Sequence, residues 1–245
     1  MGLGEPKKRP ESDTTEQVSP CAACAVRDMA FCGALNDREM PHLLAILQTA
    51  TVEPHGSIID EGEAADYLFN VTQGAVKLYK LLPDGRRQIT GFLFEGDFLG
   101  IAMNERYAYS AEAVGQISLC RFSRRKLERL LDEFPKLEKR LLGMASNELV
   151  QAQDQILLLG RKTAQEKIVS FLLNLSDRQV KRGAPASPIL LPMGRADIAD
   201  YLGLTTETVS RTITNLKRKG YIKLLQGGMV ELPDSEALQE LAEGS

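Results

Sequence analysis

Short apolar runs separated by turn residues characterise the chain between about Thr51 and Phe122. β-Branched and aromatic residues dominate each run, and Gly, Pro and Asp stand between them. Strands this short at such regular spacing predict an antiparallel β-roll of the jelly-roll kind. Before the roll, the stretch His42–Leu47 predicts a short helix. The predicted strands are 57–59, 67–71, 75–79 and 88–92.

A helical periodicity begins near Leu137 and continues without proline to Leu159. Apolar or small residues recur at alternating intervals of three and four, which is the a/d pattern of a coiled coil. A second stripe, Leu137, Leu141 and Met144, lies on a neighbouring face, and two apolar faces need two neighbours. We therefore expect a helix over 136–160 that packs on the roll and also pairs with a second subunit. The expected seam is Leu142, Ala145, Leu149, Ala152, Ile156 and Leu159.

Residues 195–213 have the pattern of a helix-turn-helix. Gly203 suits the tight turn, and either Thr205 or Thr206 can cap the second helix. Farther on, two apolar runs flank Gln226–Gly228, which predicts the hairpin of a winged helix. The C-terminal part of the chain is therefore expected to bind double-stranded DNA.

The start of the second helix carries the residues expected to recognise bases. Glu207, Ser210 and Arg211 lie at i, i+3 and i+4, so they project from one face at the end that enters a major groove. Arg suits guanine and Glu suits cytosine, and each such contact contributes roughly 1–3 kcal/mol of discrimination. The alternative is a salt bridge between Glu207 and Arg211 on a solvated helix. Thr206 and Lys217 complete the predicted contacts, Lys217 with a phosphate.

Charge is distributed unevenly and agrees with this assignment. The 245 residues have a net charge of −3, yet residues 161–225 carry +7 and residues 226–245 carry −5. A positive segment attracts a phosphate backbone. The hydrophobic content of 43% is that of an ordinary globular protein, and no apolar run approaches the roughly 18 residues of a membrane span. We expect a two-domain cytoplasmic protein with no membrane partner.

The four cysteines form a ligand pattern rather than a disulfide framework. They are sparse, and three of them, Cys21, Cys24 and Cys32, fall within twelve positions at C-x2-C-x7-C spacing. Cys120 near the end of the roll can supply a fourth thiol. Four thiolates suit either zinc or an iron–sulfur cluster, and the spacing alone does not separate the two.

A β-roll, a long helix and a winged helix with Glu-x-x-Ser-Arg together resemble the superfamily of the cyclic AMP receptor protein and the fumarate and nitrate reduction regulator. Gln88–Phe92 and Ile156–Leu159 resemble the second branch closely. The resemblance implies an α+β fold, with an antiparallel roll like a cyclic nucleotide-binding domain, a long dimerisation helix and a C-terminal winged helix-turn-helix. The expected divisions are a disordered tail at 1–20, the cysteine loop and roll at 21–135, the dimerisation helix at 136–160 and the DNA-binding domain at 161–245.

The resemblance also implies a mechanism. Oxygen-sensing members of that family bind a [4Fe–4S] cluster through three N-terminal cysteines and one central cysteine, and the intact cluster favours pairing of the dimer helices. Glu, Ser and Arg of the recognition helix read a palindromic site of the TTGAT type. The turn Pro83–Arg87 resembles the family's contact with RNA polymerase, although a plain β-turn is an equal alternative. The cluster ligands implied here are Cys21, Cys24, Cys32 and Cys120.

Two departures from the family pattern narrow the expected function. Nucleotide-binding relatives have a Glu and an Arg-Ser or Arg-Thr pair where this chain has Ile101 and Tyr109-Ser110. Cyclic AMP is therefore a poor candidate ligand. Oxygen-labile members often place a carboxylate at the seam where this chain has Ala152. The alternative is a regulator of the same fold without an oxygen-labile cluster, using zinc, haem or no cofactor. An enzyme is not expected, because the chain has no Gly-rich phosphate loop and no nucleophile elbow.

Overall fold

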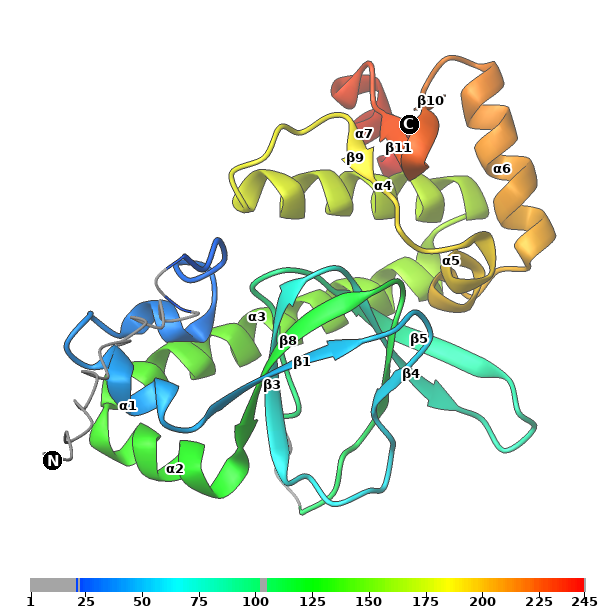
Figure 1. Cartoon of the computed structure of the whole chain (residues 1–245). Helices are drawn as coiled ribbons and strands as arrows, with labels where there is room; N and C mark the ends of the chain where they lie inside the picture. Colours follow the sequence, from blue (N-terminus) through cyan, green and yellow to red (C-terminus); the bar gives the residue numbers. More distant parts are fainter. Residues whose placement is uncertain (1–20, 22, 102–104, 245) are drawn as a thin grey trace, which may run out of the picture.

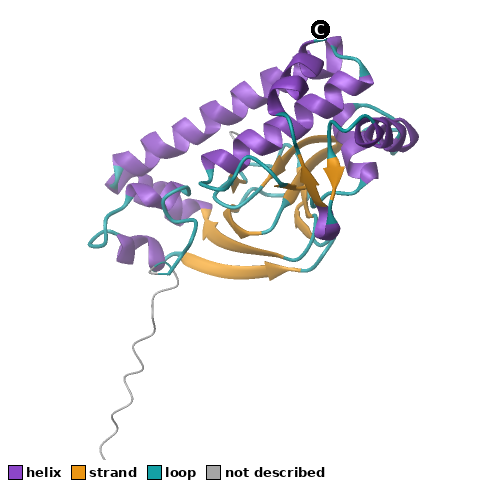
Figure 2. Cartoon of the chain, turned by 90° about the horizontal axis from the view of Figure 1, so that it is seen from above, coloured by secondary structure: helices purple, strands orange, loops and turns teal. Residues whose placement is uncertain are grey.

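The computed structural model describes residues 21, 23–101 and 105–244. The expected disordered tail, residues 1–20, lies outside these residues. A β-roll, one long helix and a C-terminal helical domain with a small sheet follow one another along the chain (Figure 1). Seen from above, helices gather along one side of the strands (Figure 2). The predicted α+β architecture is confirmed.

Two four-stranded antiparallel sheets form the roll, in the orders β1-β8-β3-β6 and β2-β7-β4-β5. All four predicted strands are present, while β1, β6, β7 and β8 were not predicted individually. The helix predicted over His42–Leu47 is instead the shorter α1 (Met40–Leu44), because Leu47 already pairs with Phe122 in the first sheet. The strands are β1 Leu47–Val52, β2 Ser57–Ile59, β3 Tyr67–Gln73, β4 Val76–Leu81, β5 Arg87–Leu93, β6 Phe98–Leu99, β7 Ser110–Ala113 and β8 Ile117–Ser123.

The segment 23–35, which we call the cysteine loop, is anchored to the end of the roll. It contains the 3-10 helix η1 (Phe31–Ala34). The fully buried ring of Phe31 meets the rings of Phe98 and Phe122 edge-on, with centroids 4.9 and 5.2 Å away. Around it lie the apolar faces of α1 and of α2 (Arg124–Glu133). This apolar cluster fixes where the loop sits.

The long helix α3 (Pro135–Arg161) is one residue longer at each end than the predicted range 136–160. The predicted second stripe is buried or half-buried, but it packs mainly against the cluster around the cysteine loop rather than on the sheets. Leu137 of this stripe is fully buried. Helix α3 therefore supports the cysteine loop directly.

The other apolar face of α3 is exposed in the single chain. Leu142, Leu149 and Ile156 of the predicted seam are 67%, 61% and 70% exposed. Ala152 is also exposed, and Ala145 and Leu159 are half-buried. Isolated exposed leucines are ordinary, but a row at a/d spacing on one helix is the pattern of a helix-pairing surface.

Helices α3 and α4 (Ala164–Lys181) are separated by only two residues. Lys162 has an extended backbone, with φ −91° and ψ 145°. Thr163 then forms a capping box, in which its hydroxyl accepts the N–H of Glu166 and the Glu166 carboxylate accepts the N–H of Thr163. Helix α4 therefore begins with its own N-cap and does not continue the hydrogen bonds of α3.

The C-terminal domain packs around one buried core. Val209, Ile213 and Leu216 project into it from α6 and are 0–3% exposed. The predicted wing is present. Strand β9, which follows the loop after α4, adds a third strand to it, in the order β10-β11-β9. The elements after α4 are β9 Ile189–Leu190, α5 Arg195–Leu202, α6 Thr206–Arg218, β10 Lys223–Leu224, η2 Gln226–Gly228, β11 Met229–Glu231 and α7 Ser235–Glu243.

A charged network joins the roll to α5. The Nζ of Lys77 lies 2.7 Å from Glu112 Oε1 and 3.1 Å from Asp197 Oδ1. Arg87 donates to Asp197 at 2.9 Å and to Asp200 at 3.0 Å. The side chain of Lys77 is 3% exposed and that of Asp197 is 12% exposed. Buried charges require such pairing, so the network fixes how the first helix of the helix-turn-helix lies on the roll.

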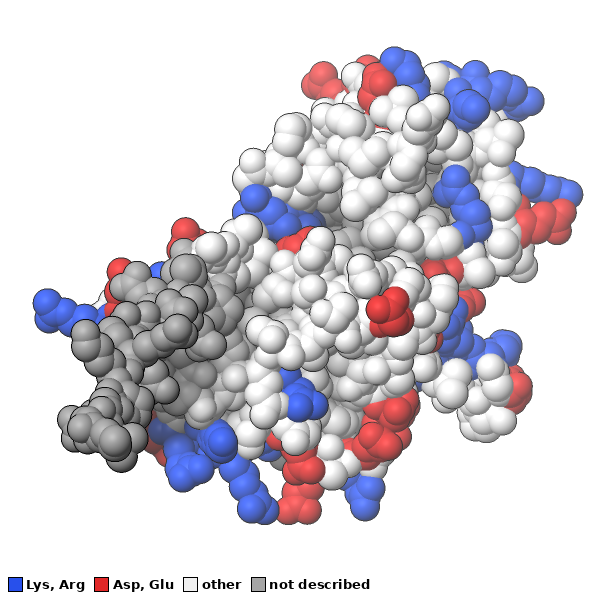
Figure 3. Space-filling model, in the orientation of Figure 1, with Lys and Arg blue, Asp and Glu red and all other residues white. Residues whose placement is uncertain are grey.

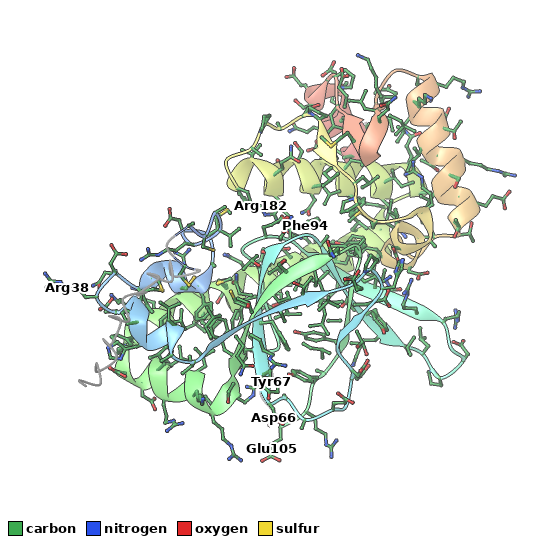
Figure 4. All side chains as sticks on the ribbon, in the orientation of Figure 1. Arg38, Asp66, Tyr67, Phe94, Glu105 and Arg182 are labelled. Atoms are coloured by element: carbon green, nitrogen blue, oxygen red, sulfur yellow. The ribbon has the colours of Figure 1, made fainter. Side chains whose placement is uncertain are left out.

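Arginines from α4 make a second contact between the domains. Arg178 lies 2.5 Å from the Asp97 carboxylate and donates to the Phe92 carbonyl at 2.8 Å. The guanidinium carbons of Arg178 and Arg182 lie 4.9 and 4.8 Å from the ring centroid of Phe94. Figure 4 labels Arg182 and Phe94. Stacking and hydrogen bonding together hold α4 against the turn after β5.

Candidate DNA-reading surface and cysteine pocket

The start of α6 is built by local hydrogen bonds that the sequence predicts. Gly203 ends α5 in a left-handed conformation, with φ 62° and ψ 42°, which a residue with a side chain adopts only with strain. Thr205, rather than Thr206, is the N-cap, and its hydroxyl accepts the N–H of Thr208 at 3.1 Å. The left-handed Gly203 and the Thr205 cap together set the angle between α5 and α6.

The predicted base-reading residues lie together on the exposed face of α6. Glu207, Ser210 and Arg211 are all exposed, and so are Thr206 in the first turn and Lys217 in the last. Lys and Arg side chains gather over α6 and the wing at the upper right of Figure 3. The surface is positioned to meet a polyanion.

Glu207 and Arg211 form an ion pair with Oε1 and Nη2 2.5 Å apart, as the alternative interpretation of the pattern predicted. Their side chains are 70% and 80% exposed. An exposed i,i+4 pair contributes only about 0.3–0.5 kcal/mol, whereas a bidentate base contact contributes about 1–3 kcal/mol. The pair therefore does not prevent either residue from binding bases.

The exposed face of α6 continues beyond the predicted base-reading residues. Thr214 and Asn215 lie one turn beyond the predicted trio, and Arg218 donates to the Asn215 amide oxygen at 3.0 Å. Continuing the i, i+3, i+4 spacing from position 210 would have found Thr214. A shallow hollow on this face is lined by Ser210, Arg211, Thr214, Asn215 and Arg218.

The four cysteines come together, although they lie far apart in the sequence. All four line one pocket. Cys24 and Cys32 belong to the cysteine loop, Cys21 lies just before it in the sequence, and Cys120 comes from β8, where it pairs with Asn70 of β3 and Thr49 of β1. The other residues that line the pocket are Arg27, Phe31, Leu43, Leu47, Asn70, Thr72 and Phe122.

The pocket disfavours thiolates in the protein alone. Burial, followed by the charges of the neighbouring cysteines, raises the pKa of Cys32 to about 11 and that of Cys120 to about 12. Burial, followed by the charge of Cys24, also raises the pKa of Cys21. These thiols would bind a cationic group as thiolates. Binding would therefore release their protons to solvent.

The polar lining of the pocket is incompletely hydrogen-bonded. Asn70 is 3% exposed and donates to the Val71 carbonyl at 3.2 Å, but its Oδ1 has no hydrogen-bond partner among the described residues. Buried polar atoms without partners are rare in native proteins. Within the described part of the chain, no group of three or more His, Cys, Asp or Glu side chains is arranged to hold a single metal ion.

Comparisons with known proteins agree with both halves of the architecture. Residues 49–134 match the family model of the cyclic nucleotide-binding domain, and residues 166–241 match that of the Crp-like helix-turn-helix domain. The transcriptional activatory protein AadR of Rhodopseudomonas palustris is 42% identical over 219 residues, which are 89% of this chain and 91% of AadR. The chain belongs to the CRP/FNR superfamily.

Other members of the CRP/FNR superfamily are similar over most of the chain. The nitrogen fixation regulation protein FixK of Bradyrhizobium diazoefficiens is 40% identical, over 91% of this chain and 93% of FixK. The solved structure of FixK2 from Bradyrhizobium japonicum gives a TM-score of 0.74 at 37% identity, over 80% of this chain and 97% of FixK2. The chain is thus a transcription regulator of the CRP/FNR type with a DNA-binding domain.

Ile101, Tyr109 and Ser110, the residues predicted to stand where nucleotide-binding relatives have their clamp, carry no charge. The Tyr109 hydroxyl accepts the N–H of Gly100 at 2.9 Å, next to Ile101. Burial raises the pKa of Tyr109 to about 12, so it stays neutral. Ser110 accepts the N–H of Glu61. Among Ile101, Tyr109 and Ser110 there is no carboxylate or guanidinium, the groups expected from the sequence comparison to hold a cyclic nucleotide.

Two further observations concern the rest of this CRP/FNR chain. Among the described residues, no helix is both long enough and apolar enough to cross a membrane.

In the turn Pro83–Arg87, Asp84 accepts from the N–H and Nε of Arg86, and Arg86 is exposed. Arg87 instead begins β5 and pairs with Asp197 and Asp200, so it belongs to the interface between the domains.

Proposed function

We propose that this chain is an oxygen-responsive transcription regulator of the cytoplasm. In this proposal Cys21, Cys24, Cys32 and Cys120 bind a [4Fe–4S] cluster, which favours a homodimer that binds a palindromic TTGAT-type site. The observation that carries the proposal is that four thiols from two distant segments line one pocket, beside the apolar cluster on which α3 packs.

The residues of the pocket suit such a group. Four thiolates are the usual ligands of a [4Fe–4S] cluster, and a cluster of this kind supplies a centre that oxygen breaks down. The raised pKa values of Cys32 and Cys120 mean that the pocket favours neutral thiols unless cationic iron balances their charge. Asn70 also lines this pocket, and its Oδ1 has no hydrogen-bond partner among the described residues.

Dimerisation connects the pocket to DNA binding. Two subunits paired through the seam on α3 would carry two α6 helices, and a palindrome whose half-sites lie about one DNA turn apart would receive them. One subunit alone makes half of the base and phosphate contacts. Glu207, Ser210 and Arg211 would then read the same half-site sequence in each subunit.

One observation favours a second candidate, a regulator of the same fold without an oxygen-labile cluster. Ala152 is an exposed methyl at the middle of the seam, where a carboxylate would repel its counterpart. Without that repulsion the dimer can form without help from a cofactor, and the cysteines could then bind zinc or serve another purpose. The fold and DNA-reading surface are common to both candidates.

The exposed turn that contains Arg86 is the proposed contact with RNA polymerase. The Nε of Arg86 donates to the Asp84 carboxylate at the surface of the roll. Leu81 and Leu82 beside them are 61% and 41% exposed. Reversing the charge of Arg86 to Glu is expected to lower transcription activation in vitro while DNA affinity stays unchanged. Equal loss of DNA binding would contradict this role.

Metal analysis of protein purified without oxygen tests the sensor. We expect four iron and four sulfide per chain, a brown colour, and loss of both colour and DNA affinity in air. A colourless protein with one zinc per chain would support the second candidate. The variant Cys24→Ser is expected to lose the cluster, and unchanged anoxic DNA binding in that variant would contradict the proposed switch.

A further inference from the structure

Arg140 of α3 donates to three consecutive backbone carbonyls of the cysteine loop. Its Nε lies 3.0 Å from the Ala30 oxygen, and its Nη2 lies 3.0 Å from the Met29 oxygen. The same Nη2 also donates to the Asp28 oxygen. These residues lie between the second and third cysteines of the sequence.

The local structure of the loop leaves these carbonyls open to a side-chain donor, and that of Ala30 also accepts the N–H of Gly33 at 3.1 Å. The N–H groups of Met29 and Ala30 both donate to Val26, which closes a single helical turn. The last carbonyls of a helical turn lack partners within it, and a cation there is favourable. The rigid fork of a guanidinium can serve several carbonyls at once, whereas an ammonium cannot hold the same geometry.

Arg140 lies on the same face of α3 as the buried stripe. Leu137 and Met144 are three and four residues away from it, so all three lie above one another on the face that supports the loop. Leu142, the first seam residue, lies two residues later, which is about 3 Å along the helix axis. One rigid segment of helix thus contacts the cysteine loop and presents the seam.

We propose that Arg140 is a positioning residue that couples the order of the cysteine loop to the pairing of α3 with a second subunit. This rests on the proposed function, because cluster binding is what would order the loop. When the loop is ordered, three hydrogen bonds fix the start of α3 against it. When it is disordered, Arg140 loses these acceptors and that end of the helix loses its support. By linkage, subunit pairing must stabilise the ordered loop to the same extent.

Lys136 provides a matched control. It lies one turn before Arg140 on α3, and its Nζ pairs with the Glu39 carboxylate outside the cysteine loop. The Lys136 side chain is 42% exposed. Removing this surface pair should have little effect, because exposed ion pairs contribute little to stability. An effect confined to Arg140 therefore cannot come from charge removal on α3 in general.

The test compares full-length wild type with Arg140→Met, Arg140→Lys and Lys136→Met, each purified without oxygen. Amide hydrogen exchange measures order in residues 23–35, sedimentation measures the dimer dissociation constant, and visible absorbance follows bleaching in air. We expect Arg140→Met to exchange faster in the loop, to bleach faster and to dissociate about tenfold more readily. Arg140→Lys should be intermediate, and Lys136→Met should match wild type.

Faster loop exchange in Arg140→Met with an unchanged dimer dissociation constant would overturn the coupling, and so would unchanged exchange. If the wild type contains no iron, the proposed function fails, but the same comparison of loop exchange and dissociation still decides the role of Arg140. If the wild type contains iron and Arg140→Met matches Lys136→Met, the coupling alone fails. The Arg140→Lys variant keeps the test valid should Arg140→Met fold poorly.

Discussion

The buried ammonium of Lys77 lies 3.1 Å from the carboxylate of Asp197, 120 residues later in the chain. Lys77 belongs to the β-roll, and Asp197 belongs to the first helix of the helix-turn-helix. The pair, together with Glu112 and Arg87, makes the orientation of that motif depend on the roll.

Replacing Lys77 by Met is expected to lower the free energy of unfolding by roughly 2–4 kcal/mol, because Asp197 and Glu112 lose a buried counter-charge. Urea titration measures this. The control is Lys80→Met, in the same strand but with a 52% exposed side chain paired with Glu61, for which less than about 1 kcal/mol is expected. Equal effects of the two variants would refute the role assigned to the buried network.

Replacing Arg211 by Ala should lower the preference for the cognate site over a site with its guanine changed by about 1–3 kcal/mol. Lys217→Ala should instead weaken binding to both sites alike and reduce the dependence of affinity on salt by about one phosphate contact. Fluorescence anisotropy with the two duplexes at several salt concentrations separates the two effects. Identical behaviour of the variants would contradict the division into base and phosphate contacts.

Leu149→Asp should shift the dimer strongly toward monomer, because it places two carboxylates at the paired seam. Val150→Asp should not, since position 150 lies outside the a/d positions. The two side chains are 61% and 54% exposed in the single chain, so exposure alone predicts equal effects. Sedimentation of both variants tests the seam, and a monomeric Val150→Asp would mean that the pairing face is misassigned.

The thiols of the iron-free protein should make its stability depend on pH. The folded pKa of Cys32 is about 11, against an ordinary value of 9.0. Because folding favours the protonated thiol, this contribution is complete below about pH 9 and is lost as the pH rises toward 11. Urea unfolding at pH 8 and pH 10.5 should show a smaller fall in stability for Cys32→Ala than for wild type. Parallel falls would contradict the burial of that thiol.

Elements that depend on a local pattern of residues could be predicted from the sequence. The helix-turn-helix and the exposed apolar stripe on α3 follow from helical spacing, and the turn at Gly203 follows from the chemistry of one residue. The recognition helix was found because its caps and its buried face are all within about a dozen residues. Thr214 lines the same hollow as Ser210 and Arg211, and continuing the spacing from position 210 would have included it.

Contacts between distant residues could not be predicted in this way. Nothing near Lys77 indicates that a carboxylate 120 residues later neutralises it. Likewise, the hydrogen bonds from Arg140 to the cysteine loop join segments about 110 residues apart. Strand β8 was not predicted as a separate element, although its pairing on both sides is what brings Cys120 to the loop cysteines. Tertiary pairing of this kind has no local periodicity.

The capping box at Thr163 has a consequence for how such regulators could diversify. Since α4 begins with its own cap two residues after α3 ends, a genetic crossover at Lys162 would interrupt neither helix. Evolution could therefore attach a different input module to the same DNA reader by recombination at this point. The requirement on any incoming module would be a buried cation able to neutralise Asp197.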